Sequence, residues 1–248
     1  MIKKVLKVLL RPFWPFLESL IIRILSIKSL SVVQNTQNID DYRTYLLSNI
    51  DIHTIIECGS GVGDYVSKFN NSNNNYIIHC IDPYHLSIEQ LKIRLKNENN
   101  CHFYNAGILN VPGIQNLIIY GIPEGNSFFE LNEKVVPYLR EIEKIEISCL
   151  KMDSFIKKNK LKNQILLHVD ANGSEYSILS SAKENLEKKH FKLIELETVL
   201  PNVYKTNNQD SISSCISLLN KYGYNLLKTY IEPVSYTLSK QIFFFDCR

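Results

Sequence analysis

The sequence contains a glycine-rich turn directly after a short apolar run. It reads Ile55-Ile56-Glu57-Cys58-Gly59-Ser60-Gly61-Val62-Gly63. Glycines let the backbone approach a ligand closely and expose amide groups where a helix begins. The G-x-G-x-G spacing differs from the G-x-G-x-x-G of dinucleotide loops, and a carboxylate at Glu57 would repel a pyrophosphate but pair with an amino group. The turn therefore favours S-adenosylmethionine over NAD. This cofactor would be held by Glu57, Gly59, Ser60, Gly61 and Gly63. The alternative is a glycine turn that binds no ligand.

Two further apolar runs end in polar residues that would lie at the same edge of a sheet. Asp82-Pro83 follows Gly63 by 19 residues, the spacing at which an acidic side chain reaches both ribose hydroxyls of a nucleoside. Asn105-Ala106 ends the next run and is expected to face the adenine. The alternatives are a turn or helix cap at Asp82 and a simple turn at Asn105.

A third stretch carries candidate catalytic groups and reads Leu166-Leu167-His168-Val169-Asp170-Ala171-Asn172-Gly173-Ser174-Glu175. Methyl transfer to a hydroxyl is an in-line displacement that needs close alignment and removal of a proton. Asp170 is predicted to orient the acceptor and His168 to act as the base. The alternative for His168 is a residue on the strand face that never meets the substrate.

Two more carboxylates, Glu195 and Glu197, lie two residues apart on a predicted strand and so face one side of it. Together with Asp170 they could hold a magnesium ion through oxygen ligands. A hydrogen-bonded pair at the strand end is the interpretation that we favour, and no metal is expected.

Apolar runs alternate with helical patterns from residue 40 onwards. Strands are predicted over residues 53–58, 76–81, 101–105, 164–169, 193–196, 225–230 and 241–245. Helices are predicted over residues 62–69, 87–96, 175–188 and 211–222, after a first helix capped by Asp40 or Asp41. This alternation predicts a Rossmann-like, doubly wound α/β domain with a mostly parallel sheet that binds its ligand at the carboxyl ends of the strands.

One segment, residues 108–147, breaks the alternation with Gly, Pro, Asn and aromatic residues and is expected to be irregular. An insertion beside the carboxyl ends of the strands is where acceptor specificity is usually built. Its aromatic residues, Phe128 and Phe129 among them, either stack on a sugar ring or bury the insertion.

Charge is distributed unevenly along the 248 residues. Residues 1–30 hold six basic residues and one acidic residue, a charge of +5, while the remainder holds −2. A body near −2 argues against a nucleic-acid partner, which would need a basic face. Residues 1–36 are predicted to form a basic amphipathic helical extension and residues 37–248 the main domain. The extension either lies on an anionic membrane or packs on protein.

The six cysteines form no C-x-x-C pair, and most of them lie in or beside apolar runs. We expect reduced, buried thiols and a cytoplasmic protein, which the N-terminal extension could attach to the inner face of a membrane.

These motifs together resemble the FkbM family of S-adenosylmethionine-dependent methyltransferases over roughly residues 50–247. The resemblance covers the glycine loop, Asp82-Pro83, Asn105-Ala106, Cys149-Leu150-Lys151-Met152-Asp153 and the stretch from His168 to Glu175. The family's version of the last stretch reads lysine-isoleucine-aspartate-valine-glutamate-glycine-alanine-glutamate. Asp170, Gly173 and Glu175 match it, whereas His168 and Asn172 replace the lysine and the central glutamate.

The resemblance implies a class I methyltransferase fold and O-methylation of a sugar hydroxyl on a surface glycan or its precursor. Two other functions stay open at this point. One is a nicotinamide-dependent oxidoreductase on a similar fold, against which the loop spacing and Glu57 argue. The other is a non-catalytic, membrane-linked module, which the changes at His168 and Asn172 leave open.

Overall fold

The computed structural model describes residues 38–69, 76–121, 125–136, 139–162, 164–199, 203–205, 211–233 and 239–247. The predicted N-terminal extension, residues 1–36, lies outside these residues, and so does its proposed membrane contact. No helix in the described ranges is both long enough and apolar enough to span a membrane.

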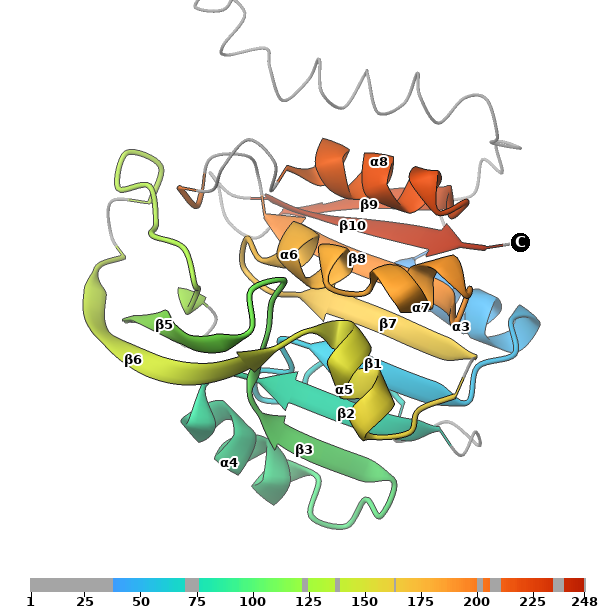
Figure 1. Ribbon diagram of the computed structural model, residues 1–248, viewed down its shortest axis with the longest axis horizontal. Coiled ribbons are helices and arrows are strands. Elements are labelled where there is room, and N and C mark those ends of the chain that lie inside the picture. Colours follow the sequence, from blue (N-terminus) through green and yellow to red (C-terminus); the bar gives the residue numbers. More distant parts are fainter. Residues whose placement is uncertain are drawn as a thin grey trace, which may run out of the picture. The chain divides into compact units, whose positions relative to one another are not determined.

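A seven-stranded sheet forms the centre of the domain (Figure 1). Its strands are β1 (Thr54–Cys58), β2 (Ile77–Asp82), β3 (Cys101–Asn105), β7 (Ile165–Asp170), β8 (Phe191–Val199), β9 (Asn225–Pro233) and β10 (Ser239–Asp246), in the order β3-β2-β1-β7-β8-β10-β9. The first five are parallel, and β10 pairs antiparallel with both β8 and β9. β1 and β7 are buried along almost their whole length, as expected for parallel strands covered on both faces.

Helices cover both faces of this sheet. They are α3 (Ile39–Asn49), the 3-10 helix η2 (Val66–Lys68), α4 (His85–Arg94), α5 (Met152–Lys158), α6 (Glu175–Ser180), α7 (Lys183–Glu187) and α8 (Ile212–Lys221). Apolar residues of α3, η2 and α4 share one core cluster with β1 and β2, whereas α5 to α8 lie along the other face (Figure 1). The fold is therefore the predicted Rossmann-like, doubly wound α/β domain.

Three local predictions were wrong. The cap of α3 is Asn38, whose side chain accepts a hydrogen bond from the backbone N–H of Asp40; Asp40 and Asp41 lie in the first turn instead. The helix predicted over residues 62–69 is reduced to η2, and Gly63, with a φ of +90°, lies outside the helical conformation. The helix predicted over residues 175–188 is divided into α6 and α7 near Ser181, whose hydroxyl bonds back to the carbonyl of Ile178.

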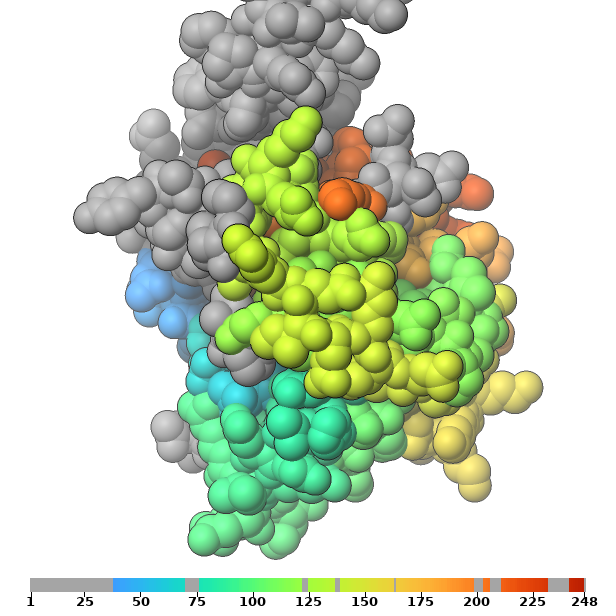
Figure 2. Space-filling view, turned by 90° about the vertical axis from the view of Figure 1, so that its left-hand side faces the viewer, coloured from blue at the N-terminus to red at the C-terminus, as the bar shows by residue number. Residues whose placement is uncertain are grey.

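The segment predicted to be irregular contains a second sheet. It has three strands, β4 (Gly107–Ile108), β5 (Gly113–Tyr120) and β6 (Glu141–Leu150), in the order β4-β6-β5. This inserted sheet lies beyond the carboxyl ends of the parallel strands (Figure 1), and it occupies the middle of the face seen from that side (Figure 2). The insertion therefore stands beside the edge where ligands bind in such sheets.

Asp153, the aspartate that follows β6, lies in α5 and caps a different helix, α7. The N-cap residue of α7, Ala182, has no side chain that can do so. The Asp153 carboxylate accepts hydrogen bonds from the backbone N–H groups of Glu184 (3.0 Å) and Asn185 (3.2 Å). It thereby ties α5 to the helices that follow β7.

We expect Asp153→Ala to lower the free energy of unfolding by about 1–2 kcal/mol, the range for loss of an N-cap side chain. Thermal or urea unfolding measures this. Asp41→Ala is the matched control, because Asp41 is an exposed first-turn acid of α3. An equal effect of the two substitutions would contradict the capping role of Asp153.

Candidate active site

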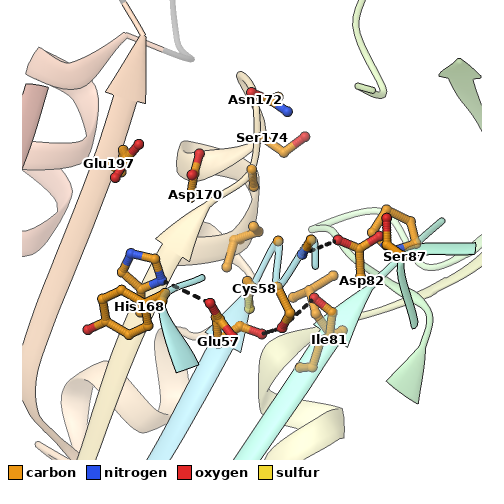
Figure 3. A pocket seen from close by; sticks show the side chains of 18 of the residues that line it. Glu57, Cys58, Ile81, Asp82, Ser87, His168, Asp170, Asn172, Ser174 and Glu197 are labelled. Atoms are coloured by element: carbon orange, nitrogen blue, oxygen red, sulfur yellow. Dashed lines mark hydrogen bonds and ion pairs between the residues drawn. The ribbon is translucent and has the colours of Figure 1, made fainter. Parts of the chain in front are cut away.

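A cavity of about 610 Å³ opens at the carboxyl ends of β1, β2 and β7 (Figure 3). The chain runs from β1 outwards to β2 and β3, and later from β7 outwards to β8, so the strand order reverses between β1 and β7. The loops that follow these two strands diverge to opposite faces, which leaves a crevice between them. Among the residues predicted from the sequence, those lining the cavity are Glu57, Gly59, Ser60, Gly61, Asp82, Ala106, His168 and Asp170.

Gly59 allows the loop after β1 to lie against the end of β7. Its φ is +87°, and a Cβ built on it would stand 1.7 Å from the carbonyl oxygen of Asp170. No side chain fits there. Gly61 also has a positive φ, of +49°, and faces open space in the cavity wall.

Gly63 does not line the cavity, although we predicted it with the other glycines. A Cβ at Gly63 would stand 2.4 Å from a methyl group of Leu91 on α4. This glycine therefore lets the loop pack closely on α4, and any effect that it has on a ligand passes through the shape of the loop.

Asp82 is buried at the end of β2 and faces the glycine loop. One carboxylate oxygen accepts a hydrogen bond from the backbone N–H of Gly61 (2.9 Å) and the other from that of Tyr84 (2.8 Å). Burial raises the pKa of Asp82 to about 6, although both hydrogen bonds oppose the shift. Each oxygen keeps a lone pair with which it can accept a further hydrogen bond.

Asn105 and Ala106, predicted to face the adenine, take different positions. Ala106 lines the cavity. Asn105 is exposed and outside the lining, where its amide donates to the carbonyl oxygens of Pro83 (2.8 Å) and Asp82 (3.2 Å). Asn105 therefore fixes the turn after β2 rather than facing the cavity.

Glu57 is buried beneath the glycine loop, with 1% of its surface exposed. Burial raises the pKa of its carboxyl well above the ordinary value, and the charges of Asp170 and Asp82 add to the shift. Its Oε2 atom has no hydrogen-bond partner among the described residues. A buried carboxylate in this state is costly unless a cation approaches it.

His168 and Asp170 lie on β7, two residues apart and on the same side of the strand. His168 is buried, and its Nδ1 lies 3.9 Å from Oε1 of Glu57, too far for a hydrogen bond but close enough for charge interaction. Asp170 is half-buried at the strand end and pairs in register with Glu197 of β8, which also lines the cavity. Figure 3 shows Asp170 and Glu197 above the imidazole, and Glu57 below it.

Glu195 does not face the cavity, as a magnesium ligand would have to. Its carboxylate is buried and accepts hydrogen bonds from Nε of Arg43 (3.0 Å) and from the hydroxyl of Tyr65 (2.7 Å). Glu195 therefore does not join Asp170 and Glu197 as a third carboxylate of a metal site. The described residues contain no group of three or more metal-binding side chains. The contacts with Arg43 and Tyr65 were not predicted, because no short motif links three residues so far apart in sequence.

The loop after β7 is shaped by Glu175 and attached to the insertion by Asn172. The Glu175 carboxylate accepts from the backbone N–H groups of Ala171 (3.2 Å) and Gly173 (3.1 Å). Asn172, at a φ of +50°, donates from its amide to the carbonyl of Asn126 (3.0 Å), and its own carbonyl accepts from the hydroxyl of Ser127 (2.6 Å). The insertion therefore closes one side of the cavity through Asn172.

Comparison with known families adds a decisive finding. The family described as "Methyltransferase FkbM domain" matches residues 57–226, more than two thirds of the chain. The chain belongs to the FkbM methyltransferase family. It is an S-adenosylmethionine-dependent methyltransferase, and the oxidoreductase alternative is set aside.

The chain is also similar to solved structures, among them three methyltransferases. A precorrin-6y C5,15-methyltransferase from Geobacter metallireducens is 11% identical with a TM-score of 0.45, covering 88% of this chain and 92% of that one. An rRNA methylase from Streptococcus thermophilus is 8% identical with a TM-score of 0.48, covering 86% and 98%. The methyltransferase domain of bacterial CtHen1-C is 10% identical with a TM-score of 0.47, covering 84% and 95%. No curated protein matches the chain significantly.

Within the FkbM stretch, one of the three kept residues, Asp170, lines the cavity. Gly173 and Glu175, which match the family, shape the loop and do not line the cavity. His168 and Asn172, which replace the family's residues, both line it. The cavity surface therefore combines the kept Asp170 with two replaced residues, and the residues that shape the loop are retained.

We expect Gly59→Ala to abolish cofactor binding and to lower the melting temperature, because its Cβ would collide with the main chain of Asp170. Gly113→Ala is the matched control, since Gly113 also has a positive φ (+109°) but has open space around it. The control carries only the strain of the backbone conformation, about 1–2 kcal/mol. Calorimetry and thermal unfolding distinguish the two, and indistinguishable behaviour would refute the steric argument.

Proposed function

We propose that this methyltransferase transfers the methyl group of S-adenosylmethionine to a hydroxyl oxygen of a sugar, on a surface glycan or its precursor. The observation that carries the proposal is the arrangement of the cavity. Its floor places the buried Glu57 beside His168, with the glycine loop and Asp82 on one side and Asp170 on the other. A site for a cationic nucleoside thus adjoins a site for proton removal.

The residues around Glu57 suit this cofactor. S-adenosylmethionine supplies an electrophilic methyl group on a positively charged sulfur, beside a cationic amino group. Glu57 offers a buried carboxyl whose charged form a nearby cation would stabilise, and Asp82 offers two oxygens to ribose hydroxyls. Gly59, Ser60, Gly61 and Ala106 would line its path, and Gly63 and Asn105 would support the loop and the turn.

His168 and Asp170 would act on the acceptor. Asp170 would orient the acceptor by accepting a hydrogen bond from a neighbouring hydroxyl of the sugar. His168 would accept the hydrogen bond of the reacting hydroxyl and take up its proton as the oxygen forms its bond to the methyl carbon and the carbon–sulfur bond breaks. The proton leaves a positive charge on the imidazole, which the neighbouring Glu57 stabilises. The positive charge on the sulfur disappears in the same step, so the total charge of the cavity is unchanged.

The charges around the cavity support a neutral acceptor. The acidic side chains in its wall are Glu57, Asp64, Asp82, Asp170 and Glu197. Its two basic side chains, Arg43 and Lys68, both bond to the carboxylate of Asp40. Phosphate groups of a nucleic acid would meet repulsion here, whereas a sugar hydroxyl would meet hydrogen-bond acceptors. The test is transfer of labelled methyl groups to a panel of sugars, nucleotide sugars, glycans and RNA; label on RNA alone would refute the proposal.

We expect affinity for S-adenosylmethionine to fall about tenfold as the pH is lowered from 7 to 5. Asp82 has a pKa of about 6 and must be ionised to accept both ribose hydroxyls, so protonation below pH 6 weakens binding. Protonation of Glu57 acts in the same direction. Calorimetry across this range measures the effect, with NAD as the ligand that should not bind.

Asp82→Asn is the companion variant. It should weaken binding at pH 7.5 by about 1–3 kcal/mol, the range for a buried polar group left without its partner. It should also lose the part of the pH dependence that belongs to Asp82. Constant affinity of the unaltered protein between pH 5 and 8 would contradict the role of Asp82.

Asp170→Ala is expected to abolish methyl transfer while the dissociation constant for S-adenosylmethionine stays within about threefold. His168→Ala should lower kcat by about 100-fold or more, the range for loss of a general base. Asp170→Asn keeps the shape of the side chain and removes its charge, so it distinguishes an effect of the charge from an effect of the side-chain volume. Normal turnover of either alanine variant with the acceptor found in the panel would remove that residue from the mechanism.

A further inference from the structure

A row of four buried side chains, three of which line the cavity, ends at His168. It consists of Arg43 from α3, Glu195 from β8, Tyr65 from the loop after β1, and His168 from β7. Arg43 bonds to Glu195 through its Nε (3.0 Å), and the hydroxyl of Tyr65 donates to the same carboxylate (2.7 Å). The ring of Tyr65 then lies flat on the imidazole of His168, with 3.5 Å between ring centroids and 5° between ring planes.

The polar contacts of this row fix Tyr65 at its hydroxyl end. Burial and the charge of Glu195 raise the pKa of Tyr65 well above its usual value, so the phenol stays neutral and keeps donating its proton. Burial would lower the pKa of Arg43, but the hydrogen bonds and charge of Glu195 raise it overall, so the guanidinium stays charged. The guanidinium carbon of Arg43 also lies 5.1 Å from the centre of the Tyr65 ring. Tyr65 is therefore held both by its hydroxyl and over one face.

The stacked ring limits how the imidazole can turn. When a histidine ring flips, each nitrogen exchanges places with a ring carbon, and a base works only if the correct nitrogen faces the substrate. In this structure Nδ1 is on the side of Glu57, and the other nitrogen faces the side of Asp170 and Glu197 (Figure 3). A tyrosine ring parallel to the imidazole at 3.5 Å leaves the ring no room to rotate out of this plane.

Stability alone is a poor reason for such a row. Removing an arginine and a glutamate from water costs several kcal/mol for each charge, and apolar side chains of the same volume often serve a core equally well. The row instead holds the ring of Tyr65 in one defined position against the imidazole of His168.

We propose that Tyr65, anchored by Glu195 and Arg43, is a positioning residue that fixes the plane and the nitrogen orientation of His168. The proposal rests on the proposed role of His168 as the base of methyl transfer. Tyr65 acts through His168 in this assignment and takes no part in the reaction itself.

Nitrogen-15 NMR of the imidazole rings in the free protein at pH 7.5 tests this. The chain has six histidines, and the signals of His168 are those that disappear in His168→Gln. Tyr65→Leu removes the stack, and the two ring nitrogens of His168 should move toward a common chemical shift because the freed ring exchanges between its two tautomers. Tyr65→Phe keeps the ring and loses the bond to Glu195, and should broaden and shift the same signals by less.

Tyr224→Phe is the matched control, because Tyr224 is a fully buried tyrosine outside the cavity lining. It should leave the His168 signals unmoved. With an acceptor from the panel, Tyr65→Phe should lower kcat about tenfold and leave the cofactor dissociation constant within twofold.

The two proposals fail in different ways. Unaltered His168 signals in both Tyr65 variants would overturn the positioning role. If Tyr65→Leu does not fold, unaltered signals in Tyr65→Phe are enough to overturn it. If the Tyr65 variants shift the His168 signals but His168→Ala transfers methyl groups normally, Tyr65 does restrain the ring of His168. The proposed role of His168 as the base is then refuted.

Discussion

The site depends on the close approach of Gly59 to the main chain of Asp170. This approach brings the loop after β1, with its buried Glu57, against the end of β7, which carries His168 and Asp170. A residue with a side chain at position 59 would separate these two strand ends and open the floor of the cavity. A glycine in a backbone conformation that other residues avoid is the solution here, because the contact leaves no space for a Cβ.

The buried carboxyls make the free site electrostatically unfavourable. Glu57 and Asp82 both have raised pKa values because burial penalises their charged forms, and Asp170 lies near enough to add to the shift of Glu57. A cationic ligand relieves this penalty, whereas an anionic ligand increases it. The same groups that favour a sulfonium nucleoside therefore disfavour a dinucleotide, so charge and loop shape point to the same ligand class.

The inserted sheet and the Arg43–Glu195–Tyr65 contacts act on opposite sides of the cavity. The insertion is attached to the loop after β7 by two hydrogen bonds of Asn172, so its position follows the position of that loop. On the other side, the hydroxyl of Tyr65 is bonded to the buried Glu195, and its ring is stacked on His168. The residues that would meet the acceptor are thus restrained from both directions, which suits a reaction that demands alignment of two reacting atoms.

The sequence by itself determined the fold class, the family and the strand ends that carry the site. Period-two and helical patterns reflect local burial, and the glycine loop, Asp82 and the stretch from His168 to Glu175 are contiguous motifs whose chemistry can be recognised locally. Tertiary structure alone decided which of these residues face the cavity: Ala106 does and Asn105 does not, and Gly63 packs on Leu91. It also decided that the segment predicted to be irregular contributes β5 and part of β6 to a second sheet, and that Glu195 bonds to Arg43 and Tyr65. Those contacts join residues 130 and 152 positions apart, and no local pattern encodes a pairing that arises only when distant strands and helices pack.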